Sequence, residues 1–315
     1  QVFKDFNLTF DIFREKRRDI FMTRENSIPE IVGTGETKIT SNNGEMENKG
    51  LDLAIDYNKQ ITKDFFLSFK STLTFARNKV LKMDEPPYFE YPGLSDVGHP
   101  LGTYWGYVAD GLFPDQETID NSPRQDLGYT PQPGDIKYVN QPNAKGEYDN
   151  VINSNDRVAI GHPYDPELVY GFGPSMKWKN WDFSFFFQGV ARTSFMMYGM
   201  HPFGTTSIKN MLQFVADDHW SVDNPNPNAA YPRLTKDSNG NNDQYSTYWL
   251  RNAAFLKLKN AEIGYTYKGM RFYLSGVNLL TFSPFKHWDP EMGGGNGLYY
   301  PTQRVFNIGF QMTIQ

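Results

Sequence analysis

Apolar and polar residues alternate with a period of two in seven segments of the chain, and this alternation constrains the fold more than any other feature. In the first segment, the run FNLTFDI that begins at Phe6 places each apolar side chain two positions from the next. Successive side chains of a β-strand point to opposite faces, so each segment predicts a strand with one apolar and one polar face. The predicted strands are 6–12, 51–57, 65–75, 168–178, 181–187, 256–267 and 306–314. An eighth segment, 270–281, is also strand-like, but apolar residues lie on both of its faces.

The parity of the alternation slips once, inside the sixth predicted strand. Leu258 continues the apolar face that precedes the slip, and Ala261 begins the apolar face that follows it. One extra residue in one strand of an antiparallel pair produces such a shift. We therefore predict a β-bulge around Lys259 and Asn260.

The connections between the predicted strands are short and long in turn. The long ones are residues 14–49, 78–166, 191–253 and 282–303, and each stands at the same end of successive strand pairs. Long connections without structure of their own are uncommon in compact soluble domains. Transmembrane β-barrels have strands of about ten residues, apolar outward and polar inward, with short turns at one end and long loops at the other. The pattern favours such a barrel over the alternative, a soluble β-sandwich with a core rich in aromatic rings.

Composition excludes several function classes. The formal charge is −5 and the sequence has no basic block, so nucleic acid is not expected as a partner. The absence of cysteine rules out disulfides, thiolate metal sites and a cysteine nucleophile. No apolar run reaches the length of a membrane helix. The chain begins with Gln1 and shows no signal peptide, so we expect a processed form or a fragment.

Several runs of residues are specific enough to compare with a known family. In chain order they are NKGLDL (48–53), HPLGTYWGYVADGLF (99–113), PGDIKYVN (133–140), NDRVAIGHPYDPELVYGF (155–172), YWLRNAAFLKLKNAEIGYT (248–266), LSGVNLLTFS (274–283), DPE (289–291) and YPTQRVFNIGF (300–310). Together they resemble the C-terminal barrel region of SusC/RagA-type TonB-dependent outer-membrane transporters. The resemblance extends over nearly the whole chain.

The resemblance implies that the chain is all-β and supplies about the last eight strands of a 22-stranded transmembrane barrel in the outer membrane of a Gram-negative cell. The plug, the TonB box and the earlier strands would then precede Gln1. It further implies TonB-dependent import of oligosaccharides or oligopeptides, outer-membrane lipid around the barrel, and a SusD-like surface lipoprotein as a lid. No cofactor and no enzymatic activity are implied.

Two features depart from the family pattern. Many relatives follow the GDIKY motif with an Asp-rich run that resembles a calcium loop, whereas here only Asp149 and Asp156 remain as nearby carboxylates. Calcium prefers six to eight oxygen ligands, several of them charged, so we expect no metal here. Relatives also end on an aromatic residue, and we expect one further residue, a phenylalanine, after Gln315.

Aromatic side chains in the long connections are the candidate ligand contacts, because sugar rings and apolar peptide side chains pack on flat π faces. The candidates are Tyr88, Phe89, Tyr91, Trp105, Trp220, Trp249, Trp288, Tyr299 and Tyr300. The alternative for each is that the ring only holds a loop together or contacts the lid protein. The five histidines are far apart in sequence and form no metal-binding motif, and no catalytic motif is present.

Two other functions stay open from sequence. One is a self-contained eight-stranded outer-membrane barrel with adhesive loops, whose lumen would be filled by side chains. The other is a secreted carbohydrate-binding β protein. Residues upstream of Gln1 would separate the first from the transporter, and solubility without detergent would favour the second.

Overall fold

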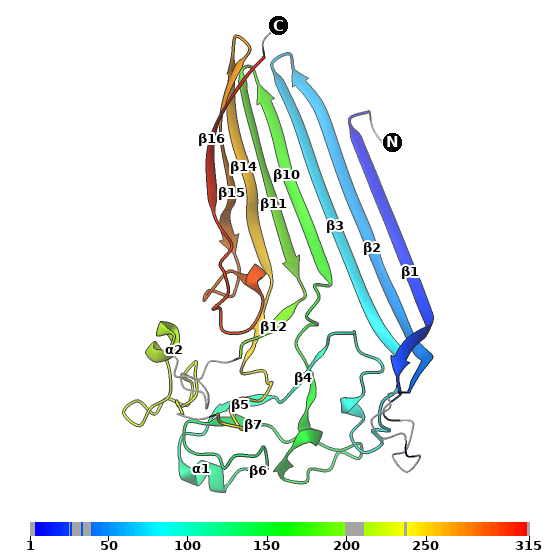
Figure 1. Cartoon of the computed structure of the whole chain (residues 1–315), viewed down its shortest axis with the longest axis vertical. Coiled ribbons are helices and arrows are strands. Elements are labelled where there is room, and N and C mark those ends of the chain that lie inside the picture. Colours follow the sequence, from blue (N-terminus) through cyan, green and yellow to red (C-terminus); the bar gives the residue numbers. More distant parts are fainter. Residues whose placement is uncertain are drawn as a thin grey trace.

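A computed structural model describes residues 4–24, 26, 33, 39–198, 211–235 and 238–313 of the chain. Eight long strands form one antiparallel sheet in the order β1-β2-β3-β10-β11-β14-β15-β16 (Figure 1). Their bounds are β1 Phe6–Thr23, β2 Thr40–Thr62, β3 Phe65–Lys82, β10 Leu168–Trp178, β11 Trp181–Ala191, β14 Phe255–Tyr267, β15 Met270–Phe282 and β16 Val305–Met312. All eight predicted strands are present, although Ile314 and Gln315 lie outside the described residues.

The predicted bulge is confirmed in β14. Leu258 pairs with Phe187 on one side and Leu280 on the other, and the register resumes at Asn260 on both sides. Lys259 is thus the extra residue relative to β11, and it moves the apolar face from even to odd positions. Relative to β15 the extra residue lies in β15, where Asn278 and Leu279 stand between Val277 and Leu280.

The first two strands extend far beyond their predicted ends. The predicted connection 14–49 is wrong, because residues 14–23 and 40–49 continue the β1–β2 ladder. Charged side chains occupy both faces of this part, so the alternation of apolar and polar residues disappears although the strand does not end. Ion pairs on neighbouring strands, Arg14–Glu47 at 2.5 Å and Lys16–Glu45 at 2.7 Å, help to hold the pairing.

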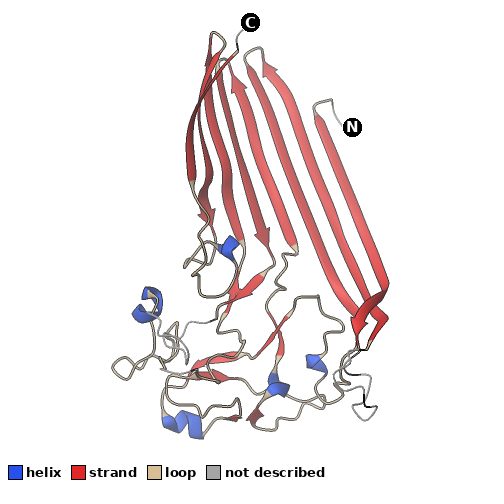
Figure 2. Cartoon of the chain, in the orientation of Figure 1, coloured by secondary structure: helices blue, strands red, loops and turns tan. Residues whose placement is uncertain are grey.

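The two ends of the sheet differ. Residues 63–64, 179–180 and 268–269 form tight turns at one end, beside both chain termini, and the long connections lie at the other end (Figures 1 and 2). Lys179 and Lys268 have positive φ angles of 52° and 47°, and Gly269 has 82°, which suits two-residue hairpin turns. β1 and β16 are the two edges of the sheet and do not pair with each other among the described residues.

The long connections fold into a body of their own, which holds the hydrophobic core. Its short strands pair as β4 with β9, β5 with β7, β6 with β8 and β12 with β13. The bounds are β4 Tyr104–Gly106, β5 Ala109–Leu112, β6 Arg124–Gln125, β7 Ile136–Tyr138, β8 Val151–Ile152, β9 Val158–Ile160, β12 Ser194–Met196, β13 Leu250–Asn252, α1 Gln116–Asp120 and α2 Gln213–Asp217. Its described residues also include the 3-10 turns Pro92–Leu94, Ser154–Asp156 and Pro290–Met292. Neither α-helix of the described part is long and apolar enough to cross a membrane.

The apolar face of the large sheet is exposed. Ile12 is 76% exposed and Ile308 88% exposed, and rings such as Phe10 and Phe272 are also open. Within the described part of the chain, every other sheet has only two strands, so no second sheet covers this face. A β-sandwich would bury it. The sandwich interpretation therefore does not agree with the structure.

Gly50, in the NKGLDL run, is required by close packing within the sheet. A Cβ at this position would overlap the carbonyl oxygen of Phe75 in β3 and the ring of Phe13, which lies across the glycine from β1. Any side chain would therefore separate β2 from a neighbour.

Replacement of Gly50 by valine is expected to destabilise the sheet by about 1–3 kcal/mol, since overpacking forces backbone shifts. Urea unfolding of the complete protein would measure the loss. Ala54→Val is the matched control, because Ala54 lies on the same strand and face and its neighbours in register are Thr9 and Thr72. Equal stability of the two variants would contradict the packing role of Gly50.

Candidate ligand-binding site in the long connections

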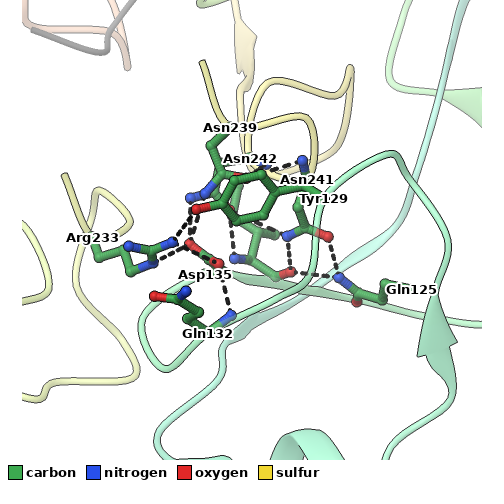
Figure 3. Close-up of polar contacts among 9 residues, drawn as sticks. Gln125, Tyr129, Gln132, Asp135, Arg233, Asn239, Asn241 and Asn242 are labelled. Carbon is green, nitrogen blue, oxygen red and sulfur yellow. Dashed lines mark hydrogen bonds and ion pairs between the residues drawn. The ribbon is translucent and has the colours of Figure 1, made fainter. Parts of the chain in front are cut away.

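A buried carboxylate joins the second and third long connections. Asp135, from the PGDIKYVN run, is fully buried and accepts hydrogen bonds from Arg233 Nε to Oδ1 at 2.7 Å and from Arg233 Nη2 to Oδ2 at 3.3 Å (Figure 3). Gly134 precedes it with a φ of +86°, and the ring of Trp220 occupies the space that a side chain would need. This close approach explains the glycine beside the aspartate.

Asparagines from the third connection complete the shell around Asp135. The side-chain amides of Asn239 and Asn242 each donate to Asp135 Oδ1 at 2.9 Å, and Asn242 Oδ1 accepts from the Ile136 N–H at 2.9 Å. Asn241 donates to the Ile136 carbonyl at 2.9 Å (Figure 3). A buried charge that is both paired and hydrogen-bonded fixes the relative position of two segments about a hundred residues apart.

A cluster of rings joins the third and fourth connections. Phe195 packs edge-on against Phe285 with centroids 4.9 Å apart, and Trp288 packs against Phe285 at 4.5 Å. Phe214 of α2 stacks on His287 at 4.2 Å. Burial lowers the pKa of His287, with a smaller effect from the charge of Arg251. Because the rings come from separate loops, their packing holds those loops together.

The DPE run anchors the fourth connection to the polar face of β14. Lys257 is fully buried, and its Nζ lies 2.6 Å from Asp289 Oδ2 and 2.5 Å from Glu291 Oε2. Lys259, the bulge residue, pairs with Glu291 Oε1 at 2.7 Å. Two ammonium groups thus meet at the carboxylate of Glu291, and one of them also holds Asp289.

The nine aromatic candidates fall into three environments. Trp220 and Trp249 are buried in the loop core, which leaves little ring surface for a ligand. Trp105 and Trp288 are half-buried, and each donates its indole N–H to its own connection, to Asp96 at 2.6 Å and to the Gly293 carbonyl at 2.9 Å respectively. The remaining five reach the surface in part or in full: Tyr88, Phe89, Tyr91, Tyr299 and Tyr300.

The structure gathers five tyrosines from three connections into one group, which we call the tyrosine cluster. Its members are Tyr104, Tyr164, Tyr198, Tyr245 and Tyr299. Four of them are 49–58% exposed, so rings and hydroxyls are open to solvent. Sequence reasoning found only Tyr299, because nothing in the local sequence distinguishes the other four from ordinary loop tyrosines.

Tyr198 and Tyr299 both approach Gly295, since atoms of each ring lie within 4 Å of the position that a Cβ of this glycine would take. Burial, with smaller effects from the hydroxyls of Tyr164 and Tyr245, raises the pKa of Tyr104 to about 12. A side-chain hydrogen bond with Tyr299 raises the pKa of Tyr198. The hydroxyls of Tyr104 and Tyr198 are therefore neutral at physiological pH and can both donate and accept hydrogen bonds.

The cluster has the properties of a binding surface for a polar, uncharged or weakly charged ligand. Tyrosine offers an apolar ring and a polar hydroxyl with only two rotatable side-chain bonds, so contact costs little conformational entropy.

The described residues hold no group of three or more His, Asp or Glu side chains arranged for a metal. The carboxylate of Asp156 instead accepts backbone N–H groups, from Gln141 and Asn153, both at 2.7 Å.

Breaking the Asp135–Arg233 pair is expected to loosen the loop body. Arg233→Met leaves a buried carboxylate without its cation, which costs about 3–5 kcal/mol. Arg124→Met is the matched control, because the exposed Arg124 pairs with an exposed carboxylate of Asp126 and its loss should change stability by less than about 0.5 kcal/mol. Urea unfolding with limited proteolysis would measure both. Equal protease resistance of the two variants would show that the pair does not hold the loops.

Comparison with curated proteins finds relatives along almost the whole chain, although no family model matches it. TonB-dependent receptor P3 of Formosa agariphila is 25% identical over 97% of the chain and 32% of its own length. TonB-dependent receptor P26 of the same organism is 28% identical over 89% of the chain and 30% of its own length. TonB-dependent receptor SusC of Bacteroides thetaiotaomicron is 26% identical over 91% of the chain and 28% of its own length.

Comparison with solved structures finds the same fold. The RagAB peptide transporter matches with a TM-score of 0.69 at 21% identity, and the RagAB peptide importer in its open-open state with 0.72 at 18% identity. Each match covers 98% of the chain and 33% of the solved chain. The chain therefore spans about a third of the length of these proteins. Over nearly its whole length, it is a homologue of TonB-dependent receptors that include SusC, and it shares the fold of the matching part of the RagAB transporter.

Proposed function

We propose that the chain is the C-terminal part, about eight of 22 strands, of a closed barrel in the outer membrane of a Gram-negative bacterium, which imports an oligopeptide or oligosaccharide with energy from TonB. The observation that carries this proposal is the antiparallel sheet with one exposed apolar face and all of its long, folded connections at one end. A bilayer covers such a face, and closure of the barrel pairs every edge.

The two unpaired edges of the large sheet favour the hypothesis that the chain is part of a larger barrel over the hypothesis that it forms a barrel by itself. An eight-stranded barrel would pair its first strand with its last, whereas β1 and β16 are the outer strands of this sheet among the described residues. Exposed edges of this length invite further strands. The plug and the remaining strands would then lie outside this chain.

The orientation follows from the two kinds of connection. Short turns face the periplasm and long loops face the exterior in barrels of this type. The ion-paired extensions of β1 and β2 project on the loop side, where water rather than lipid would surround them. A SusD-like surface lipoprotein would cover the loop body as a lid.

The tyrosine cluster is the proposed ligand contact. Its five rings come from loops that the Asp135 shell and the aromatic packing hold in place. Tyr299 is common to the cluster and the sequence candidates. For Tyr88, Phe89, Tyr91, Trp105 and Tyr300 we propose contact with either the ligand or the lid, and for Trp220, Trp249 and Trp288 a structural role.

Cysteine labelling would test the orientation. The chain contains no cysteine, so Lys145→Cys and Lys179→Cys each introduce one label site, in a long connection and in a short turn respectively. In intact cells a membrane-impermeant maleimide should react with the first and not the second, and both should react after lysis. Labelling of the Lys179→Cys variant alone in intact cells would contradict the proposed orientation, and recovery of the protein without detergent would favour a secreted binding protein.

Ligand binding by the complete transporter would test the cluster. Tyr198→Ala and Tyr299→Ala are each expected to weaken binding by about tenfold, because a ring contact and a hydroxyl are lost. Calorimetric titration with a tetrapeptide and with a maltooligosaccharide would also identify the ligand class. Tyr148→Ala removes an equally exposed ring outside the cluster and should leave affinity unchanged. Unchanged affinity in all three variants would exclude the cluster from binding.

A further inference from the structure

The register of the first three strands places cations side by side immediately beyond the apolar face. Ile12, Leu51 and Phe75 are neighbours and form the last apolar row on the loop side. Two residues further along each strand, on the same face, the neighbours are Arg14, Lys49 and Arg77. Like charges directly opposite each other repel, so this row of three cations is unfavourable unless an anion lies against it.

The next row adds two more cations and one carboxylate. Lys16, Glu47 and Lys79 are neighbours there, and Glu47 pairs with Arg14 at 2.5 Å and with Lys49 at 2.7 Å. Glu47 is almost fully buried by these contacts, whereas Arg14 and Lys49 keep more than half of their side chains exposed. One carboxylate therefore neutralises only part of the charge.

Neighbouring ion pairs do not remove the excess. Arg77 lies 3.0 Å and Arg192 2.7 Å from oxygens of the buried Glu167, and Arg192 also lies over the ring of Phe75 on the apolar face. Lys16 pairs with Glu45. Lys79 has no carboxylate partner among the described residues. Six cations thus surround three carboxylates at this margin of the sheet.

A groove lies at the same place. It encloses about 660 Å³, with Leu51 and Phe75 from the apolar row and Lys49, Arg77 and Lys79 from the rows above it. Its rim is the segment 98–100, which is fixed to β3 by hydrogen bonds from Gly98 N to the Val80 carbonyl at 2.8 Å and from Val80 N to the His99 carbonyl at 2.9 Å. Glu47, the carboxylate between Arg14 and Lys49, also lines it, so the groove combines an apolar base, three cations, one carboxylate and a rigid edge.

We propose that this margin, Arg14, Lys49, Arg77 and Lys79 above Leu51 and Phe75, is a binding site for the phosphate group of a lipid in the outer leaflet. The inference rests on the proposed membrane location. The apolar base would contact acyl chains, while guanidinium and ammonium groups bind phosphate oxygens at headgroup level. The occupant is a lipid rather than free phosphate because the groove continues the apolar face of the sheet.

Native mass spectrometry of the detergent-solubilised complete protein would test the site, with lipid A and its dephosphorylated form as probes. The wild type should retain the phosphorylated lipid, and Arg14→Gln/Lys49→Gln/Arg77→Gln should retain at least about tenfold less. Lys79→Gln alone, which breaks no ion pair, should reduce retention severalfold without affecting folding. Lys59→Gln/Lys63→Gln/Lys179→Gln removes three exposed cations at the short-turn end and should leave retention unchanged.

Equal retention of both lipids, equal retention by the Lys79→Gln variant and the wild type, or displacement of the lipid by inorganic phosphate would overturn the proposal. Fractionation of cells that produce the same proteins distinguishes failure of the lipid site from failure of the proposed outer-membrane function. Absence of the wild type from the outer membrane would refute the proposed function itself. Its presence there without selective retention would refute only the lipid site.

Discussion

The rest of the structure depends on one constraint, the exposed apolar face of the large sheet. Strands such as β10 and β11 form their backbone hydrogen bonds with neighbouring strands of the sheet, so the two faces of the sheet carry only side chains. The described part of the chain does not cover the apolar face, which therefore needs another apolar environment. A hydrophobic core therefore cannot form on the sheet. It forms instead at one end, where the long connections bury Tyr138, Phe195 and Tyr231 among themselves. The exposed apolar face and the folded loop body are therefore two consequences of the same separation of apolar residues between the sheet and its connections.

Buried charges organise the loop body, which has few regular elements. Asp135 binds Arg233 and two asparagines and so joins the second and third connections. Lys257 binds the DPE turn and so joins the fourth connection to β14. Each buried charge has its opposite partner and hydrogen bonds, so the cost of desolvation is offset and only one arrangement of the loops satisfies it. This gives the exposed tyrosine cluster a fixed support, a condition for recognition by side chains that themselves lie on loops.

The strands could be predicted because their signal is local. Alternation in β3, β10 and β14 depends only on residues two positions apart, and the bulge at Lys259 was visible as one change of parity. Alternation did not predict residues 14–23 of β1, because charged side chains take the place of apolar ones there. Residues 14–23 continue β1 because their partners across the ladder are complementary, and that information lies some thirty positions away, at Glu45 and Glu47.

The sequence by itself determined where the strands lie, which of their faces is apolar, and the resemblance to SusC/RagA-type transporters. Only the tertiary structure decided which loop residues share a surface. Trp249 and Tyr299 are both aromatic loop residues, yet one is buried and the other stands in an open cluster with Tyr104 and Tyr198. The physical reason is distance along the chain. Contacts such as Asn239 with Asp135 join residues 104 positions apart, and the row of cations follows from strand register, so neither leaves a local pattern.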